Sequence, residues 1–401
     1  MAGFRGRFPD IRARRPNQYI WGGLAMTAKI ARFLEEVRPA TPCVVVDLDV
    51  VRDNYMGLRH WLPLAQVYYA VKANPAPEII RMLVGLGSSF DVASRGEVDL
   101  CLENGARADN ISFGNTIKKQ SDIAYAYSKG VRLYAFDSEA ELEKLAESAP
   151  GSRVFCRILM TCDGAEWPLS RKFGCEIEMA KDLLVKAREL GMDPYGVSFH
   201  VGSQQTDLNQ WDIAVGKAAM LFTALNEAGI DLKMMNLGGG FPAKYRTDIP
   251  AVERYADAVM HAMTNHFGNA LPAMIIEPGR SLVGDAGVLE AEVVLISKKS
   301  YDEDVRWVYL DIGKFGGLAE TMDEAIKYRI QTPRDGEETA PVVLAGPTCD
   351  SADILYEKAG YEMPVTLKVG DKVRILSTGA YTTSYSAVNF NGFAPLKAYF
   401  I

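Results

Sequence analysis

Lys72 is the side chain of this sequence that is best placed for covalent chemistry. It follows Val67–Val71, an apolar run that is typical of a buried strand. An amine carried into a protein interior is costly unless it is paired or used. Burial also lowers the pKa of a lysine, which makes the amine nucleophilic and able to form a Schiff base with an aldehyde. Taken alone, a lysine at a strand end more often extends to water, so the rest of the sequence must decide.

Polar groups with complementary chemistry stand at the ends of other apolar runs. They are Asp91, Arg157, His200-Val201-Gly202-Ser203, Gly238-Gly239-Gly240 and Glu277-Pro278-Gly279-Arg280. A glycine triplet lets main-chain N–H groups approach an anion closely, although most such triplets are only turns. Ser203 adds a hydroxyl donor and Arg280 a charged fork, and both suit a phosphate.

These groups together match the needs of pyridoxal 5′-phosphate. Lys72 would bind the aldehyde, and the glycine triplet would bind the phosphate. A carboxylate at the pyridine nitrogen would keep that nitrogen protonated and strengthen the ring as an electron sink, and Glu277 is the candidate. His200 could stack flat on the ring. Each group has an ordinary explanation in isolation, but several of them at one rim favour a shared site.

The elements that position these residues repeat one unit from about Val67 to Gly279: a short apolar strand, a polar loop and a helix. Eight strands are expected, over residues 67–71, 89–92, 110–113, 131–136, 153–159, 196–201, 234–237 and 273–277. Strands that alternate with helices form a parallel sheet with right-handed crossovers. Eight units predict a closed (β/α)8 TIM barrel, whose active site forms where the strands end. A doubly wound open α/β sheet is the alternative, because periodicity does not reveal closure.

A second, mostly β C-terminal domain is expected after Gly284. Strands over 291–296, 306–310, 341–345, 372–376 and 395–400 follow there without long helices between most of them. The sequence therefore predicts an N-terminal segment at 1–45, a cofactor-binding barrel at 46–284 and a β domain at 285–401. An early strand over 41–47 could join the β domain. Residues 1–25 are basic and poorly periodic, which favours a disordered tail or sequence upstream of a natural start at Met26 over a basic arm or a targeting peptide.

The composition excludes several classes of protein. With 48% hydrophobic and 24% charged residues, the chain is an ordinary globular protein. The net charge of -7 argues against nucleic acid as a partner, and no apolar stretch is long enough to span a membrane. The six cysteines form no C-x-x-C pair and the four histidines show no metal-ligand spacing, so no metal is expected. With no secretory signal visible, we expect reduced thiols in a cytoplasmic protein.

The chain resembles the ornithine/lysine/diaminopimelate decarboxylases, whose barrel is shared with alanine racemase, over about residues 42–393. The motifs that carry the resemblance are Tyr69-Ala70-Val71-Lys72-Ala73-Asn74, Phe90-Asp91-Val92-Ala93-Ser94, Lys172-Phe173-Gly174, His200-Val201-Gly202-Ser203, Gly238-Gly239-Gly240-Phe241-Pro242, Glu277-Pro278-Gly279-Arg280, Gly346-Pro347-Thr348-Cys349-Asp350 and Gly379-Ala380-Tyr381. The resemblance implies that Lys72 is the Schiff-base lysine, Glu277 the partner of the pyridine nitrogen and His200 the residue on the ring face. It implies a cofactor pocket made by Lys72, Asp91, Arg157, His200, Ser203, Gly239, Gly240, Glu277, Pro278, Gly279, Arg280 and Tyr381.

The same resemblance implies a head-to-tail homodimer with two shared active sites at its interface. Cys349 and Asp350 would reach each site from the other subunit, with Cys349 as the proton donor to Cα. Asp350 and Asp323 would bind the distal ammonium of a diamino-acid substrate. Asp323 aligns with the second substrate aspartate of ornithine decarboxylases, although Met322 replaces the tyrosine that commonly precedes it.

The segment Gly346–Asp350 is similar to the ornithine decarboxylase form, whereas diaminopimelate decarboxylases usually have Cys-Glu-Ser there. We therefore expect a bacterial-type enzyme that converts L-ornithine to putrescine in polyamine biosynthesis, with L-lysine to cadaverine as a second reaction. Diaminopimelate decarboxylase and a non-catalytic, pyridoxal-phosphate-binding regulatory homologue are the alternatives. Ornithine and lysine differ by one methylene, worth only about 1–3 kcal/mol of discrimination, so the preference between them stays open.

Overall fold

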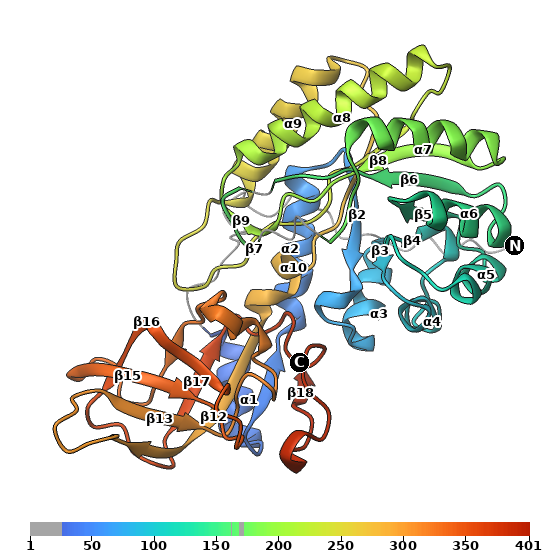
Figure 1. Cartoon of the computed structure of the whole chain (residues 1–401). Coiled ribbons are helices and arrows are strands. Elements are labelled where there is room, and N and C mark those ends of the chain that lie inside the picture. The colour runs from blue at the N-terminus through green and yellow to red at the C-terminus, as the bar shows by residue number, and fades with distance from the viewer. Residues whose placement is uncertain (1–25, 162, 168–171) are drawn as a thin grey trace, which may run out of the picture.

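The computed structural model describes residues 26–161, 163–167 and 172–401 and folds them into a barrel and a second, β-rich part (Figure 1). The two parts lie side by side, and the chain passes from the barrel to the second part after α10 (Arg280–Val283). The N-terminal tail expected over residues 1–25 lies outside the described residues. The domain boundaries given above stay a prediction.

Eight parallel strands close the barrel in the order β10-β11-β2-β3-β4-β5-β6-β8. Closure is made by β11 and β2, which pair from Met274 with Ala65 to Ile276 with Val67. The expected (β/α)8 barrel is therefore confirmed, and the open sheet is wrong. The strands are β2 Ala65–Ala70, β3 Ser89–Val92, β4 Ile111–Phe113, β5 Leu133–Phe136, β6 Arg153–Arg157, β8 Asp193–Ser198, β10 Met234–Asn236 and β11 Ala273–Ile276.

Amphipathic helices cover the outside of the barrel (Figure 1). In α3, for example, Pro77 begins the helix, where its missing N–H costs nothing, and Ile79, Ile80 and Leu83 are buried. Apolar side chains also fill the barrel interior, so that it is a packed core and polar chemistry is left to the strand ends. The covering helices are α2 Leu48–Trp61, α3 Pro77–Gly85, α4 Arg95–Glu103, α5 Gln120–Ser128, α6 Glu139–Ser148, α7 Ile177–Glu189, α8 Asn209–Glu227 and α9 Val252–Phe267.

The second part is built on an eight-stranded mixed sheet. Its first strand, β1, comes from before the barrel and pairs antiparallel with β12 and parallel with the C-terminal strand β18. The sequence analysis missed β16, whose charged residues and Gly360 interrupt the apolar pattern. The strands are β1 Cys43–Val46, β12 Gly287–Ser297, β13 Arg306–Leu310, β14 Ile330–Gln331, β15 Thr339–Ala345, β16 Ile354–Pro364, β17 Lys372–Leu376 and β18 Lys397–Phe400.

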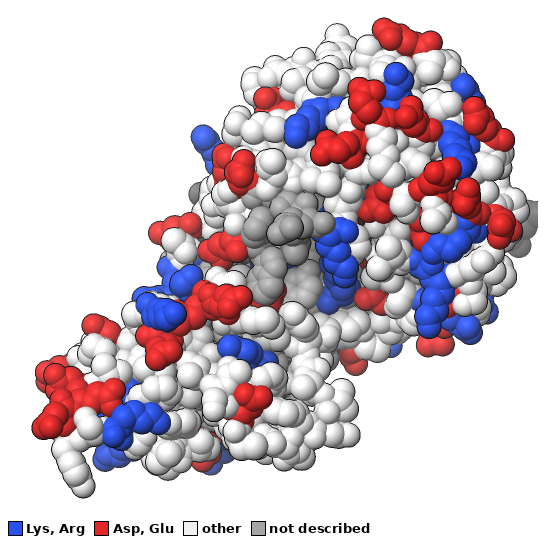
Figure 2. Space-filling model, viewed as in Figure 1, with Lys and Arg blue, Asp and Glu red and all other residues white. Residues whose placement is uncertain are grey.

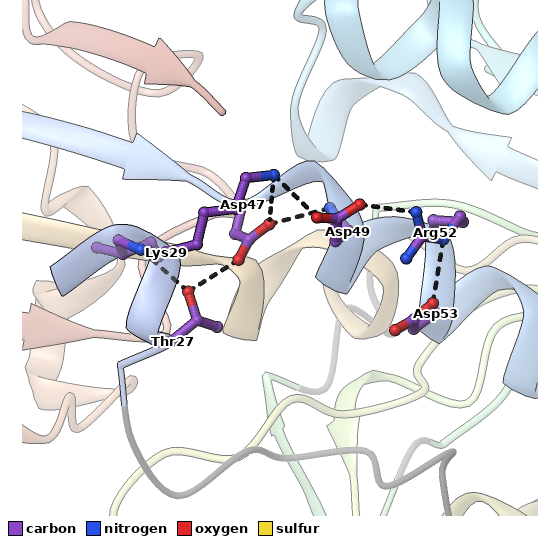
Figure 3. A network of polar contacts seen from close by, with 7 residues as sticks. Thr27, Lys29, Asp47, Asp49, Arg52 and Asp53 are labelled. Atoms are coloured by element: carbon purple, nitrogen blue, oxygen red, sulfur yellow. Dashed lines mark hydrogen bonds and ion pairs between the residues drawn. The ribbon is translucent and has the colours of Figure 1, made fainter. Parts of the chain in front are cut away.

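A polar network joins the first helix, α1 (Ala28–Val37), to the point where the chain enters the barrel (Figure 3). Asp47 accepts the N–H of Asp49 at 3.0 Å and so caps α2. The same carboxylate accepts the Thr27 hydroxyl at 2.8 Å, and Lys29 pairs with both aspartates. The network therefore fixes α1 against the junction of the two parts.

The surface carries both signs of charge. Figure 2 shows basic and acidic side chains interspersed over the face that it draws. Within the described residues, no helix combines the length and the apolar character needed to cross a bilayer.

Candidate active site

A small pocket opens where the barrel strands end and the second part begins. It gathers most of the residues singled out from the sequence. Its lining consists of Ala70, Lys72, Asp91, His200, Ser203, Gly239, Gly240, Phe241, Glu277, Gly279, Arg280 and Tyr381.

Lys72 lies in a 3-10 turn, η3 (Val71–Ala73), that follows β2. The strand ends one residue earlier than expected, and the Lys72 side chain is exposed within the pocket. Burial opposes its charged form, but the Tyr381 hydroxyl and the Asp91 carboxylate together raise the pKa of Lys72 above its usual value. The expected lowering of this pKa is therefore wrong, because acidic groups surround the amine.

Asp91 is the next-to-last residue of β3, and its charge acts on the same amine. Burial raises its pKa well above the usual value, and the negative charge of Glu277 adds to that effect. Its Oδ1 is buried and has no hydrogen-bond partner among the described residues. The carboxylate packs against Gly114, where a Cβ would stand 1.9 Å from Oδ1, so the neighbouring loop must carry a glycine there.

His200 is held as a neutral imidazole. Burial lowers the pKa of His200 well below its usual value, and the positive charges of Arg157 and Lys72 lower it further. The N–H of Gly202 donates to Nδ1 at 2.9 Å, which assigns the ring proton to Nε2. A flat, uncharged ring in this position suits contact with an aromatic cofactor.

The glycine triplet adopts a backbone conformation that would be strained for a residue with a side chain. Gly238 has φ +67° and Gly240 has φ +91°. A Cβ on Gly240 would lie 2.5 Å from the carbonyl oxygen of Gly202. The triplet therefore presents bare main chain to the pocket.

Asn236 is a site residue that the sequence analysis missed. It ends β10 and is 1% exposed. Its Nδ2 donates to Glu277 Oε1 at 2.5 Å, and its Oδ1 accepts the N–H of Gly238 at 2.9 Å. One amide thus ties the carboxylate to the glycine triplet. Its position two residues before the triplet, at a strand end, was the available signal.

Arg280 provides the charge at the other side of the pocket. Its Nη2 donates to Ser203 Oγ at 3.2 Å. Its Nε is buried without a hydrogen-bond partner among the described residues. A buried donor left unpaired costs about 1–3 kcal/mol, and a phosphate oxygen would satisfy it.

The residues present therefore fit pyridoxal 5′-phosphate. Arg280, Ser203 and the bare glycine main chain offer donors for the phosphate. Lys72 offers an amine for the aldehyde, and Glu277 offers a carboxylate for the ring nitrogen.

The second part of the molecule closes the pocket through Tyr381. The Tyr381 N–H donates to the carbonyl of Ala73 at 2.8 Å, and Asn74 Nδ2 donates to the carbonyl of Gly379 at 2.8 Å. The segment around Tyr381 is thereby fixed to the turn that carries the lysine. The Tyr381 ring lies 4.9 Å from the Arg280 guanidinium.

Two residues predicted for the pocket, Arg157 and Pro278, are not among those that line it. Arg157 ends β6 and acts on His200 through its charge. Pro278 accepts the N–H of Ala70 through its carbonyl oxygen at 3.1 Å, which joins the end of β11 to β2.

Cys349, Asp350 and Asp323 are exposed and lie outside the pocket lining. The N–H of Cys349 donates to the Asn391 side chain at 3.0 Å. Asp323 has φ 53° in the 3-10 segment η6 (Ala319–Glu324). Their roles stay predictions.

Asp353, which the sequence analysis also missed, anchors the loop that carries Cys349. It is 3% exposed. One oxygen accepts the N–H of Lys314 at 2.7 Å, and the other accepts the Thr348 hydroxyl at 2.7 Å and the Thr348 N–H at 3.2 Å. The buried carboxylate therefore holds an exposed cysteine on a fixed loop.

Comparison with known proteins agrees with this geometry. The family described as pyridoxal-dependent decarboxylase, pyridoxal binding domain, matches residues 48–284. The lysine/ornithine decarboxylase of Selenomonas ruminantium is 37% identical over 358 residues, which cover 89% of this chain and 88% of that protein. Antizyme inhibitor 2 of Xenopus laevis is 34% identical over 365 residues, which cover 87% of this chain and 78% of that protein.

A solved structure shares the whole fold. The crystal structure of SrLDC in complex with PLP and cadaverine matches with a TM-score of 0.84 at 33% identity and covers 94% of this chain and 94% of that one. The expected barrel, second β part and cofactor are thus confirmed. The chain belongs to the ornithine/lysine decarboxylase family of pyridoxal 5′-phosphate-dependent enzymes.

Proposed function

We propose that the protein decarboxylates L-ornithine to putrescine and L-lysine to cadaverine as a homodimer with shared active sites. The observation that carries this proposal is the pair Cys349 and Asp350, which stands on a fixed, exposed loop outside the Lys72 pocket. A pair in this position is available to a second copy of the chain. The similarity to a lysine/ornithine decarboxylase and to a cadaverine-bound structure supports the substrate class.

Each pocket residue has a separate role in the proposed decarboxylation. When bound, the cofactor supplies an electron sink for the pair released as the bond between Cα and the carboxylate breaks. Glu277, aligned by Asn236, holds a proton at the pyridine nitrogen. Neutral His200 covers one ring face and excludes water, and Arg280 and Ser203 hold the phosphate.

The partner's loop completes the reaction in this proposal. Its Cys349 thiol donates a proton to Cα after carbon dioxide leaves. Its Asp350, together with Asp323, binds the distal ammonium of the substrate through charge-assisted hydrogen bonds. Two carboxylates at that end favour a diamino acid over one with a distal carboxylate.

A competition assay tests the substrate. Purified protein with pyridoxal 5′-phosphate receives ornithine, lysine and diaminopimelate together, each carrying a different isotope label, because diaminopimelate loses one carbon dioxide to give lysine. The carbon dioxide and the label in putrescine, cadaverine and newly formed lysine are measured. We expect putrescine and cadaverine, with Lys72→Ala as the inactive control. A main product from diaminopimelate would contradict the substrate assignment.

One other function has a specific observation in its favour. The similarity to antizyme inhibitor 2 favours a regulatory homologue that does not catalyse. If the competition assay yields no carbon dioxide from protein with bound cofactor, that function replaces our proposal.

Mixing two inactive variants tests the shared sites. Lys72→Ala lacks the lysine of one pocket and Cys349→Ala lacks the loop thiol, so a mixed dimer contains one complete site. After subunit exchange we expect about a quarter of the wild-type kcat, because half of the dimers are mixed and each has one working site. If activity does not rise above that of the separate variants, the sites are not shared.

A further inference from the structure

A buried carboxylate that the proposed chemistry does not use lies beside the cofactor pocket. Glu320, in η6, binds both terminal nitrogens of Arg280: Nη1 donates to Oε2 at 2.6 Å, and Nη2 donates to Oε1 at 2.5 Å. Their side chains are 5% exposed for Arg280 and 7% for Glu320. A bidentate pair at this depth fixes the plane of the guanidinium.

The remaining hydrogen bonds of Arg280 show which N–H of its guanidinium has no acceptor. An arginine has five N–H groups, two on each Nη and one on Nε. Besides Glu320, Nη1 donates to the Tyr245 hydroxyl at 2.7 Å and Nη2 to Ser203 Oγ at 3.2 Å. Four donors are therefore engaged, and Nε is the one without a partner among the described residues.

The open edge of Arg280 lies beside a hydroxyl that can also donate to an anion. Nε and the outer N–H of Nη2 share one edge of a guanidinium, and Ser203 lies at that edge. Ser203, Gly240 and Arg280 all line the pocket. Glu320 binds the adjacent edge, between Nη1 and Nη2, so it orients the guanidinium and leaves Nε unoccupied.

Glu320 is itself held firmly by its own segment. The N–H of Ile326 donates to the carbonyl of Glu320 at 3.0 Å. The adjacent Thr321 is completely buried, and its hydroxyl donates to the carbonyl of Leu318 at 2.6 Å. A fixed carboxylate can therefore impose an orientation on the longer, more flexible arginine.

We propose that Glu320 is a positioning residue for the cofactor phosphate, because it holds Arg280 with Nε and Ser203 free to bind phosphate oxygens. This inference rests on the proposed assignment of Arg280 to the phosphate. It assigns Glu320 no contact with the substrate.

Glu320→Gln tests the inference, since it keeps the shape of the side chain but replaces one acceptor with an N–H that opposes an N–H of Arg280. Apoprotein is titrated with pyridoxal 5′-phosphate and, separately, with pyridoxal, which lacks the phosphate; binding is followed by absorbance. We expect the Kd for pyridoxal 5′-phosphate to rise at least about tenfold, the order expected for a lost charge-assisted hydrogen bond. The Kd for pyridoxal should not change, and a general loss of packing would move both.

Glu324→Gln is the matched control, because Glu324 belongs to the same segment but accepts main-chain N–H groups of Glu357 and Lys358 away from the pocket. It should leave both Kd values unchanged. If Glu320→Gln does not fold, Tyr245→Phe removes the other partner of Nη1 and should weaken pyridoxal 5′-phosphate selectively, by a smaller factor.

The inference is overturned if Glu320→Gln leaves the ratio of the two Kd values unchanged, binds pyridoxal 5′-phosphate more tightly, or alters only the KM for the amino acid. Arg280→Ala distinguishes a failure of the role of Glu320 from a failure of the assignment of Arg280 to the phosphate. If Arg280→Ala raises the Kd for pyridoxal 5′-phosphate and Glu320→Gln does not, only the role of Glu320 fails. If neither variant raises it, the phosphate assignment itself is wrong.

Discussion

Replacing Asn236 by leucine tests whether the orientation of the Glu277 carboxylate depends on a single buried amide. Leucine has a similar volume, so the change removes the hydrogen bonds to Glu277 and Gly238 and leaves no large cavity. Glu277 then loses the group that orients Oε1, and the glycine triplet loses one of its anchors.

The magnitude follows from the two bonds. A hydrogen bond to a charged group is worth about 1.5–3 kcal/mol. If this energy is needed in the transition state, kcat falls by about 10- to 150-fold. The neutral bond to the Gly238 N–H adds about 1 kcal/mol, so the free energy of unfolding should fall by about 2.5–4 kcal/mol.

Carbon dioxide release from ornithine gives kcat, and urea denaturation gives the free energy of unfolding. Asn54→Leu is the matched control, since Asn54 is also buried, its amide donates to the Asp285 carboxylate at 2.8 Å, and neither residue lines the pocket. It should lose stability but keep kcat. A wild-type kcat for Asn236→Leu would show that Glu277 does not need the Asn236 amide.

Three further changes should have separate effects. Asp353→Asn leaves too few acceptor oxygens for the three N–H and O–H donors that Asp353 binds. We expect urea denaturation to show a free energy of unfolding lower by about 2–4 kcal/mol. Because the loop that carries Cys349 is then misplaced, kcat should fall while cofactor affinity is retained. Gly240→Ala should abolish cofactor binding, measured by absorbance, because its Cβ would lie 2.5 Å from a main-chain oxygen at φ +91°. Burial lowers the pKa of Lys118, which pairs with Glu141, to about 8. The unfolded chain therefore binds more protons between about pH 8 and 10.5, and wild-type stability should increase relative to Lys118→Met by up to about 3 kcal/mol across that window. A constant difference in urea denaturation would exclude this linkage.

The barrel could be predicted from the sequence because its strands are short apolar runs separated by amphipathic helices. All eight strands lie where expected, with ends that differ by a few residues. The second sheet was harder to predict. In β16 the run Glu357-Lys358-Ala359-Gly360 has neither the alternation nor the apolar content of a strand, and pairing with β15 determines its structure.

The site residues that could be predicted are those whose side-chain chemistry is unusual at the end of an apolar strand, such as Lys72. Asn236 and Asp353 were missed, because an amide or a carboxylate near a strand end is common and only the three-dimensional contacts show what it holds. The pKa of Lys72 was predicted with the wrong sign, since the sequence reveals burial more readily than the charges that meet in space. Glu320 lies 40 residues from Arg280, so no local pattern connects the two.

Covalent trapping of the cofactor shows which lysine binds it. The protein is loaded with pyridoxal 5′-phosphate, reduced with borohydride, digested and examined by mass spectrometry. We expect a phosphopyridoxyl group on Lys72 alone, and none on the Lys72→Arg variant treated in the same way. A modified lysine elsewhere with Lys72 unmodified would show that Lys72 does not bind the cofactor.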